Sequence, residues 1–315
     1  MNRLQWLEKL GLRPGERAVV LHADDVGLCQ ATLEAYRRIH TEGCLSSASV
    51  MAPSPWLPAL AELCLRGDHD LGVHLVLNSE WSSFRFAPVS GLAAASSLVD
   101  AQGYFWASAR DTHAHARPGE VRLELEAQIQ RLRSLGLNPS HLDSHMLTLV
   151  APGLLSIYAE LGMTHGLPIS LIRLSADGLA RLCNIGAEAA QRAHGELLQA
   201  SAAGQVLFDA WAELPLNDAG DRFSHCQRLL GGLPEGVSLL ISHPAVDGPE
   251  LRALAPDWAA RVADTRLHLD PRLPKALEVE GLKLLRMREL MQAWRELQAG
   301  SAPGERFKAW PRPEH

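Results

Sequence analysis

The residues with the clearest chemical potential are two adjacent carboxylates, Asp24 and Asp25, which end the apolar stretch AVVLHA. Like charges in neighbouring positions repel, and an unpaired carboxylate that leaves water costs roughly several kcal/mol. The pair is therefore either solvated or compensated by a partner such as a metal ion.

Histidines occupy comparable positions in or after other apolar runs: His74 in LGVHLVL, His141 and His145 flanking Asp143 in HLDSH, and His243 in LLISHP. Imidazoles with one carboxylate are the ligands that a borderline divalent ion prefers. His74 alone would more often be a hydrogen-bonded core residue than a ligand. One metal ion, however, explains all of these groups together, whereas each would otherwise need its own explanation.

Other polar residues near these motifs have less defined roles. Positions 141, 143 and 145 alternate along a strand and so face the same side. Asp143 and His141 are therefore candidate supports that orient a ligand imidazole, although simple hydrogen bonding accounts for His141 equally well. His22 has the opposite strand parity to Asp25 and is interpreted as structural or peripheral. The pair His113 and His115 lies in a polar segment and is expected to be solvated.

The elements that would position these groups are short apolar runs, most of them followed by amphipathic helical patterns. Such alternation favours a mainly parallel α/β sheet or barrel, in which the carboxyl ends of the strands converge on one face. We expect helices over 31–43, 57–67, 119–136 and 249–264. The expected strands are seven, at 17–23, 45–51, 71–77, 140–144, 168–174, 237–242 and 281–285.

One region interrupts this alternation of strands and helices. Residues 78–117 carry six aromatic residues among Ser, Gly, Ala and Pro and show no clear period. A long irregular excursion is often a lid or binding loop, but a locally packed insertion explains it equally well. We expect one domain over residues 1–300 that includes this insertion, followed by a frayed tail at 301–315.

Composition limits the class of protein. A hydrophobic share of 47% and a charged share of 21% are typical of a globular chain. The net charge of −6 argues against a nucleic-acid partner. The first residues lack the apolar core of a secretory signal, and no apolar run is long enough to span a membrane, which indicates a cytoplasmic protein. Five widely spaced cysteines suggest neither a disulfide framework nor a thiolate metal site.

The motifs ADDVGL, GVHLVL and HLDSH resemble, in order and spacing, those of the YdjC-like carbohydrate deacetylases, the ChbG/HpnK group. The resemblance extends from about residue 18 to about residue 290. LLISHPAVD is similar to the family's late histidine–proline segment, which carries a cis peptide bond, and RLPKALEVEGLKLL is similar to its closing strand.

This resemblance implies an N-deacetylase of acetylated amino sugars or chito-oligosaccharides, built on an irregular (β/α) barrel of about seven mainly parallel strands. It implies one divalent metal ion, Mg²⁺ or Zn²⁺, held by Asp25, His74 and His145. Asp24 would be the general base and His243 the general acid. Family relatives are often homodimers, so a homodimer is also expected.

The implied roles agree with the chemistry of such sites. An Asp-His-His set leaves coordination positions open for water and for the amide oxygen, and the ion lowers the pKa of that water. Asp24 could then accept its proton, with a cation such as Arg173 keeping the carboxylate ionised. A protonated His243 would transfer a proton to the departing amine.

Departures from the family pattern bear on the substrate. HLDSH continues with Met146 and Leu147 where many relatives have further histidines, and Val26 replaces the usual Phe. The more apolar edge leaves room for a glycolipid-linked sugar, and no substrate-binding residue is assigned. The alternatives are a non-catalytic relative that binds metal and sugar, and a metallohydrolase of another bond.

Overall fold

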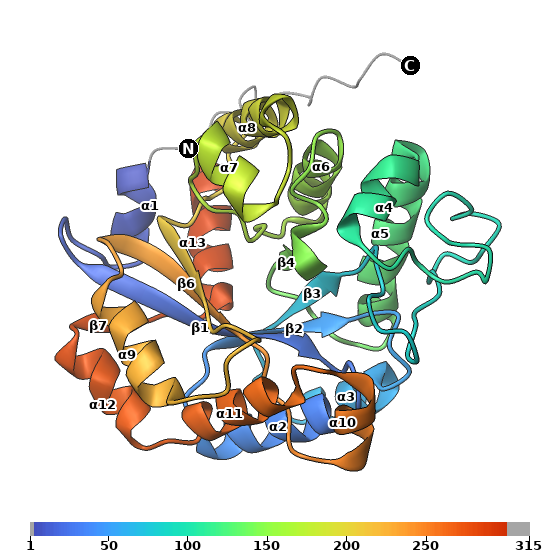
Figure 1. The fold of residues 1–315 in the computed structure, drawn as a ribbon. Coiled ribbons are helices and arrows are strands. Elements are labelled where there is room, and N and C mark those ends of the chain that lie inside the picture. The colour runs from blue at the N-terminus through green and yellow to red at the C-terminus, as the bar shows by residue number, and fades with distance from the viewer. Residues whose placement is uncertain (1–2, 301–315) are drawn as a thin grey trace.

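The computed structural model describes residues 3–300, and these form a curled parallel sheet surrounded by helices (Figure 1). The sheet has seven strands in the order β4-β3-β2-β1-β6-β5, with β7 pairing with β1, and every pairing is parallel. The strands are β1 (Arg17–Val26), β2 (Ser47–Met51), β3 (Leu71–Leu75), β4 (Leu142–Ser144), β5 (Ala210–Glu213), β6 (Gly236–Ser242) and β7 (Leu282–Leu284).

The gap between the two edge strands is bridged by an irregular segment at 168–173. Ile169 forms a parallel bridge with Leu142 of β4, and Ile172 forms one with Phe208, just before β5. The expected strand at 168–174 is thus present only as isolated bridges, whereas β5 was not predicted because AWAE is short and half-buried throughout. The predicted α/β class with a barrel-like sheet is confirmed.

Helices cover the outside of the sheet (Figure 1). The expected helix over 249–264 is interrupted because Pro256 has no N–H to donate and disfavours helix in the residue before it. The helices are α1 (Arg3–Lys9), α2 (Gln30–Glu42), α3 (Leu57–Cys64), α4 (Ala109–His115), α5 (Pro118–Ser134), α6 (Leu154–His165), α7 (Ala176–Leu182), α8 (Ala187–Ala202), α9 (Arg222–Gly231), α10 (Pro249–Leu254), α11 (Trp258–His268), α12 (Arg272–Val279) and α13 (Met287–Gly300).

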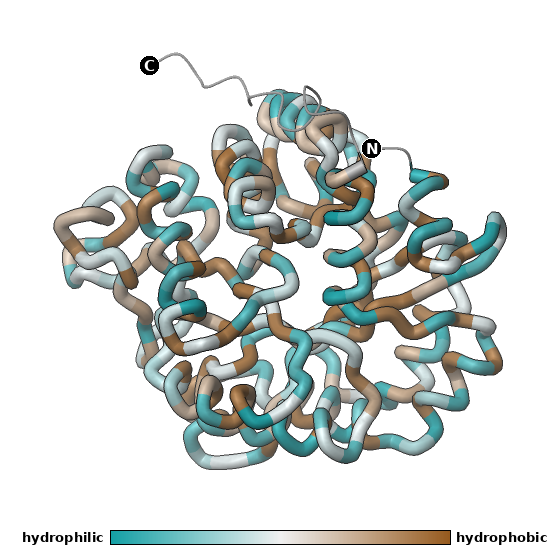
Figure 2. Tube along the Cα trace, turned by 180° about the vertical axis from the view of Figure 1, so that it is seen from behind, coloured by the Kyte–Doolittle hydropathy of each residue, from teal (hydrophilic) through white to brown (hydrophobic). Residues whose placement is uncertain are grey.

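Strand alternation divides the core between the inside and the outside of the curled sheet. Val19 of β1 packs in one cluster with Leu230 of α9 and Leu277 of α12. Its neighbour Val20 packs in another cluster with Trp6 of α1 and Trp294 of α13. Figure 2 shows the corresponding hydrophobic stretches along the inner strands. The amino-terminal end of the barrel is therefore packed shut, and the carboxyl end is left to form a site.

The aromatic insertion at 78–117 is packed against the body of the protein. Phe86 and Phe105 are buried, and the carboxylate of Glu124 in α5 accepts hydrogen bonds from the backbone N–H groups of Val89 and Ser90. The structure favours the packed interpretation for most of this segment. His113, expected to be solvated, is half-buried, and its Nε2 lies 2.8 Å from the carbonyl oxygen of Thr148.

The structure bears on the expectations about membrane-spanning helices and cysteines. Among residues 3–300, no helix is both long enough and apolar enough to cross a bilayer. All five cysteines are free thiols. The tail predicted at 301–315 lies outside the described residues.

Gly72 of β3 provides a test of the packing inside the barrel. A Cβ atom at this position would overlap the buried ring of His141, which directly precedes the neighbouring strand β4. We expect Gly72→Ala to lower the free energy of unfolding by about 1–3 kcal/mol through overpacking, measured by urea denaturation. Gly119→Ala in α5 is the control because no atom beyond its chain neighbours and its own helix backbone lies within 4 Å of its added Cβ. Equal stabilities of the two variants would contradict this account of the packing.

Candidate metal centre and active site

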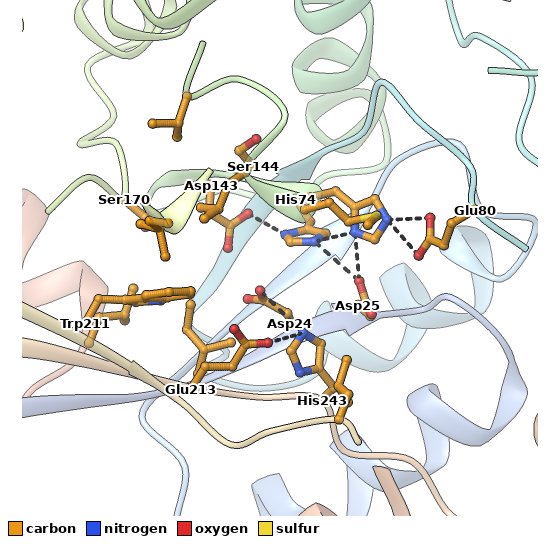
Figure 3. Close-up of a pocket in the computed structure, with 18 of the residues that line it drawn as sticks. Asp24, Asp25, His74, Glu80, Asp143, Ser144, Ser170, Trp211, Glu213 and His243 are labelled. Carbon is orange, nitrogen blue, oxygen red and sulfur yellow. Dashed lines mark hydrogen bonds and ion pairs between the residues drawn. The ribbon is translucent and has the colours of Figure 1, made fainter. Parts of the chain in front are cut away.

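The chemically active residues lie together at the carboxyl ends of the strands (Figure 3). Each comes from the end of a strand or from the loop that follows it, as the sequence motifs predict for a parallel barrel. They are Asp24 and Asp25 of β1, His74 of β3, Asp143 of β4, His145 directly after β4, Glu213 of β5 and His243 directly after β6.

Three side-chain atoms form a nearly equilateral triangle at the centre of the site. Nε2 of His74 and Nδ1 of His145 each lie 3.3 Å from Oδ1 of Asp25, and they lie 3.2 Å from each other. Three ligands held at about 2.0–2.1 Å from one tetrahedral ion would be about 3.3 Å apart. Oδ1 of Asp25 is buried and has no hydrogen-bond partner among the described residues. The donor set therefore fits a single divalent cation.

The backbone at Asp25 explains how two adjacent carboxylates reach one site. Asp25 has φ +59°, a left-handed conformation that is rare for residues other than glycine, and Gly27 follows with φ +83°. The pairing of β1 with β2 also shifts register between Ala23 and Val26. The chain thus bends where a straight strand would send Asp24 and Asp25 to opposite faces.

Carboxylates contact both imidazoles of the triangle at the ring nitrogen that points away from it. Nδ1 of His74 lies 2.8 Å from Oδ1 of Asp143, and Nε2 of His145 lies 3.0 Å from Oε2 of Glu80. Trp81 stacks on the His145 ring at a centroid distance of 5.7 Å. In the neutral form of each ring, donation from the far nitrogen to the carboxylate leaves the near nitrogen with a lone pair directed into the triangle.

A buried guanidinium neutralises the other oxygen of Asp25. Nη1 of Arg261, on α11, lies 2.8 Å from Oδ2 of Asp25, and both side chains are at most 3% exposed. Burial opposes ionisation, but Arg261 and the two histidines hold the pKa of Asp25 well below its ordinary value. The prediction that Arg173 supplies a cation to the site is wrong. Arg173 is exposed, and its side chain forms no hydrogen bond or ion pair within residues 3–300.

His22 contacts both neighbouring carboxylates. Its Nε2 lies 3.0 Å from Oδ1 of Asp24 and 2.9 Å from Oδ2 of Asp143. Burial disfavours the charged ring, but these two carboxylates raise the pKa of His22 to about 9. His22 is therefore closer to the reactive groups than its strand parity indicated, because β1 bends beyond it.

His243 faces Asp24 across the site. Its Nε2 lies 3.9 Å from Oδ2 of Asp24 and 4.0 Å from Oε1 of Glu213. Its backbone N–H donates to Asp264, which pairs with Arg222 at 2.9 Å. Burial lowers the pKa of the His243 ring. The expected cis bond before Pro244 is not present, since this peptide bond is trans.

Two further acidic residues at the site had no signal in the sequence motifs. Glu213 lies on the unpredicted strand β5, and burial together with repulsion from Asp24 and Asp25 raises its pKa to about 7. Glu80 comes from the start of the insertion. Within these motifs, His141 hydrogen-bonds with Ser140, and its Nε2 lies 3.9 Å from Asp143. His141 thus fits the simple hydrogen-bonding interpretation better than a direct support of a ligand.

The cluster opens into a cavity of about 730 Å³. Asp24, Asp25, Glu213 and His243 lie on its walls, so that a bound molecule can reach the cluster. A barrel-like sheet with an Asp-His-His cluster at the carboxyl ends of its strands defines this chain as a barrel protein with a candidate mononuclear metal site.

Comparisons with known proteins identify the family. Residues 18–279 match the model of the YdjC-like protein family, and the chain belongs to this family. A carbohydrate deacetylase from Thermus thermophilus is 37% identical over 259 residues, which are 82% of this chain and 88% of that protein. Another, from Thermoanaerobacter pseudethanolicus, is 24% identical over 255 residues, 80% of this chain and 90% of that protein. The resemblance inferred from the motifs is confirmed.

A solved structure from Enterococcus faecalis, described provisionally as a cellobiose-phosphate cleavage protein, has the same fold. It superposes with a TM-score of 0.73 at 21% sequence identity and covers 87% of this chain and 99% of its own. At this level of identity the likeness supports the architecture alone.

Removal of ligand candidates tests the metal site directly. We expect His74→Ala and His145→Ala each to lose most of the bound divalent metal, because two remaining donors no longer surround the ion. Metal content would be measured by mass spectrometry after loading and gel filtration, with the exposed His115→Ala as control. Unchanged metal content in the double variant His74→Ala/His145→Ala would refute the site.

The raised pKa of His22 predicts a pH-dependent stability. A folded-state pKa of about 9, above the ordinary value of about 6.5, contributes stability that is complete below pH 6.5 and is lost as the pH rises through 9. In chelator-treated protein, we expect Tm to fall more steeply between pH 6.5 and 9.5 in the wild type than in His22→Gln. His115→Gln should keep the wild-type slope. Parallel profiles for wild type and His22→Gln would contradict the assignment.

Proposed function

We propose that the protein is a metal-dependent hydrolase that removes the N-acetyl group from an acetylated amino sugar or oligosaccharide. The observation that carries this proposal is the triangle of donor atoms from Asp25, His74 and His145 beside a carboxylate, Asp24, that lies outside it. The relative from Thermus thermophilus, named a carbohydrate deacetylase and aligned over most of the chain, supports the substrate class.

The three donor atoms would hold one divalent ion, Zn²⁺ or Mg²⁺. When bound, such an ion polarises a carbonyl oxygen and lowers the pKa of water. Two imidazoles in the donor set favour Zn²⁺ or a similar late transition ion, while the carboxylate is also compatible with Mg²⁺. Arg261 on the far oxygen of Asp25 keeps that carboxylate ionised, which a ligand requires.

We assign the role of general base to Asp24. It adjoins Asp25 in the chain, and it lines the cavity. Nε2 of His22 lies 3.0 Å from Oδ1 of Asp24. The other oxygen, Oδ2, can accept the proton of the attacking water as the tetrahedral species forms.

We assign the role of general acid to His243. Amide cleavage requires protonation of the departing nitrogen, and Nε2 of His243 lies across from Asp24 at 3.9 Å. The bond from its backbone N–H to Asp264 anchors the backbone of this residue. A protein that only binds sugar needs neither a general base nor a general acid, so neither Asp24 nor His243 would have a chemical role in it.

The base assignment predicts the effect of one substitution. Metal-loaded protein would be incubated with N-acetylated chito-oligosaccharides and amino sugars, and the released acetate measured. We expect Asp24→Asn to retain its metal and to lose about 10²–10⁴-fold in rate, because the amide cannot accept the proton. The surface variant Asp247→Asn is the control.

Two outcomes separate the parts of this proposal. Acetate release by Asp24→Asn at the wild-type rate would remove the base assignment only. Absence of acetate release by the metal-loaded wild type from every N-acetylated sugar would contradict the deacetylase itself.

A further inference from the structure

We propose that the substrate of this site carries an aliphatic chain, which binds in an apolar arm of the cavity beside the metal cluster. This inference rests on the proposed function and specifies its substrate class. The apolar arm is the part of the cavity lined by Leu171, Ile172, Leu182, Trp211, Leu239 and Ile241.

The arm extends from the reactive groups into the barrel. His243 directly follows β6, and Ile241 and Leu239 precede it by two and four positions, so their side chains leave the same side of the strand. Both line the cavity, whereas the intervening Leu240 packs outward with Leu230 and Leu267. At about 3.3 Å per residue, the four positions from His243 to Leu239 correspond to about 13 Å along the strand, which is the depth of the arm along β6.

The barrel has room at this place because its wall is irregular there. Strands of a closed (β/α) barrel fill the interior with layers of side chains. Here the segment 168–173 joins β4 and β5 through isolated bridges only, and α7 and α8 follow it in the chain. Leu182 of α7 and Leu197 of α8 line the same cavity, which therefore extends past the sheet toward these helices.

The chemistry of the arm suits a hydrocarbon better than a sugar. Of its six side chains, only Trp211 carries a polar atom, while sugar hydroxyls require hydrogen-bond partners. Ser170, directly before Leu171 in the chain, adds one hydroxyl group to the cavity wall, whereas the charged side chains of Glu80 and Glu213 line the cavity beside the metal cluster. Figure 3 shows Trp211 across the cavity from Glu80, with Asp143 and Asp24 between them. A sugar ring fits near the carboxylates, and a chain attached to it can enter the arm.

A second, independent feature extends the apolar wall at the cavity mouth. Met146 and Leu147, directly after the ligand candidate His145, have φ values of +50° and +53°. This left-handed conformation favours Gly or Asn and is unusual for large apolar side chains. Both residues line the cavity, and Met146 is 52% exposed. Two apolar residues in a strained conformation thus face the place where a chain would enter.

The chain can belong to either end of the substrate. An acyl group longer than acetyl would place it on the carbonyl side of the amide, and an alkyl aglycone would place it on the sugar. Both present methylene groups to the same six side chains, and the experiment below separates them.

The test compares three substrates: the methyl glycoside of N-acetylglucosamine, its octyl glycoside, and N-octanoylglucosamine. Each buried methylene strengthens binding about fourfold, so burial of three gives about a 60-fold gain. We expect kcat/KM for amine release to rise by at least this factor for one of the two octyl compounds. The compound that gains identifies which end of the substrate carries the chain. Equal kcat/KM values for all three would overturn the proposal.

A charge placed in the arm provides the matched comparison. In Ile172→Glu we expect the ratio of kcat/KM between the preferred octyl compound and the methyl glycoside to fall to near one. Leu198→Glu, the same type of change at an exposed position of α8, should keep the wild-type ratio. An unchanged ratio in Ile172→Glu would also overturn the proposal.

A binding measurement tests the arm separately from the proposed deacetylase activity. It also does not depend on whether Ile172→Glu folds. Calorimetry on metal-loaded Asp24→Asn would compare Kd values for the same three compounds. Tighter binding of an octyl compound without turnover by the wild type would support the arm and contradict the deacetylase. Turnover with equal Kd values would support the deacetylase and contradict the arm.

Discussion

The buried ion pair between Asp25 and Arg261 is the interaction on which the site depends. One carboxylate oxygen faces the guanidinium at 2.8 Å, and the other faces the two imidazoles at 3.3 Å. A buried carboxylate without a cation would take up a proton and lose its value as a ligand. Arg261 therefore makes it possible for a negatively charged donor to remain inside the barrel.

The left-handed turn at Asp25 is the matching constraint on the backbone. A residue other than glycine in this conformation costs about 1–3 kcal/mol, and such strain is concentrated at functional sites. Here the turn lets two neighbouring carboxylates serve different partners: Asp25 joins the imidazoles and Arg261, and Asp24 meets His22 and faces His243. Each of the two negative charges thus has its own partners, which offset the repulsion between the neighbouring carboxylates.

The sequence motifs were sufficient to predict the centre of the site but not its surroundings. The convergence of strand ends in a parallel barrel predicts that Asp25, His74 and His145 lie near one another. Their selection as ligand candidates from the other strand-end groups came from the resemblance to the family. Arg261 could not be predicted, since it lies in the middle of a helix and its spacing from the motifs carries no information. Arg173 was chosen as the cation because the segment 168–174 resembles a regular strand. That segment forms only isolated bridges, and Arg173 is exposed. Glu213 was missed because β5 is too short and too little buried to be predicted as a strand.

The position of Arg261 has a consequence for the order in which the site is assembled. The three candidate ligands lie within residues 25–145, while the cation that balances Asp25 follows it by 236 residues. During synthesis from the amino terminus, the ligands leave the ribosome long before α11 does. Until that helix docks, Asp25 lacks the guanidinium that balances its charge. The charge balance of the site is therefore completed by one of the last helices of the chain to be synthesised.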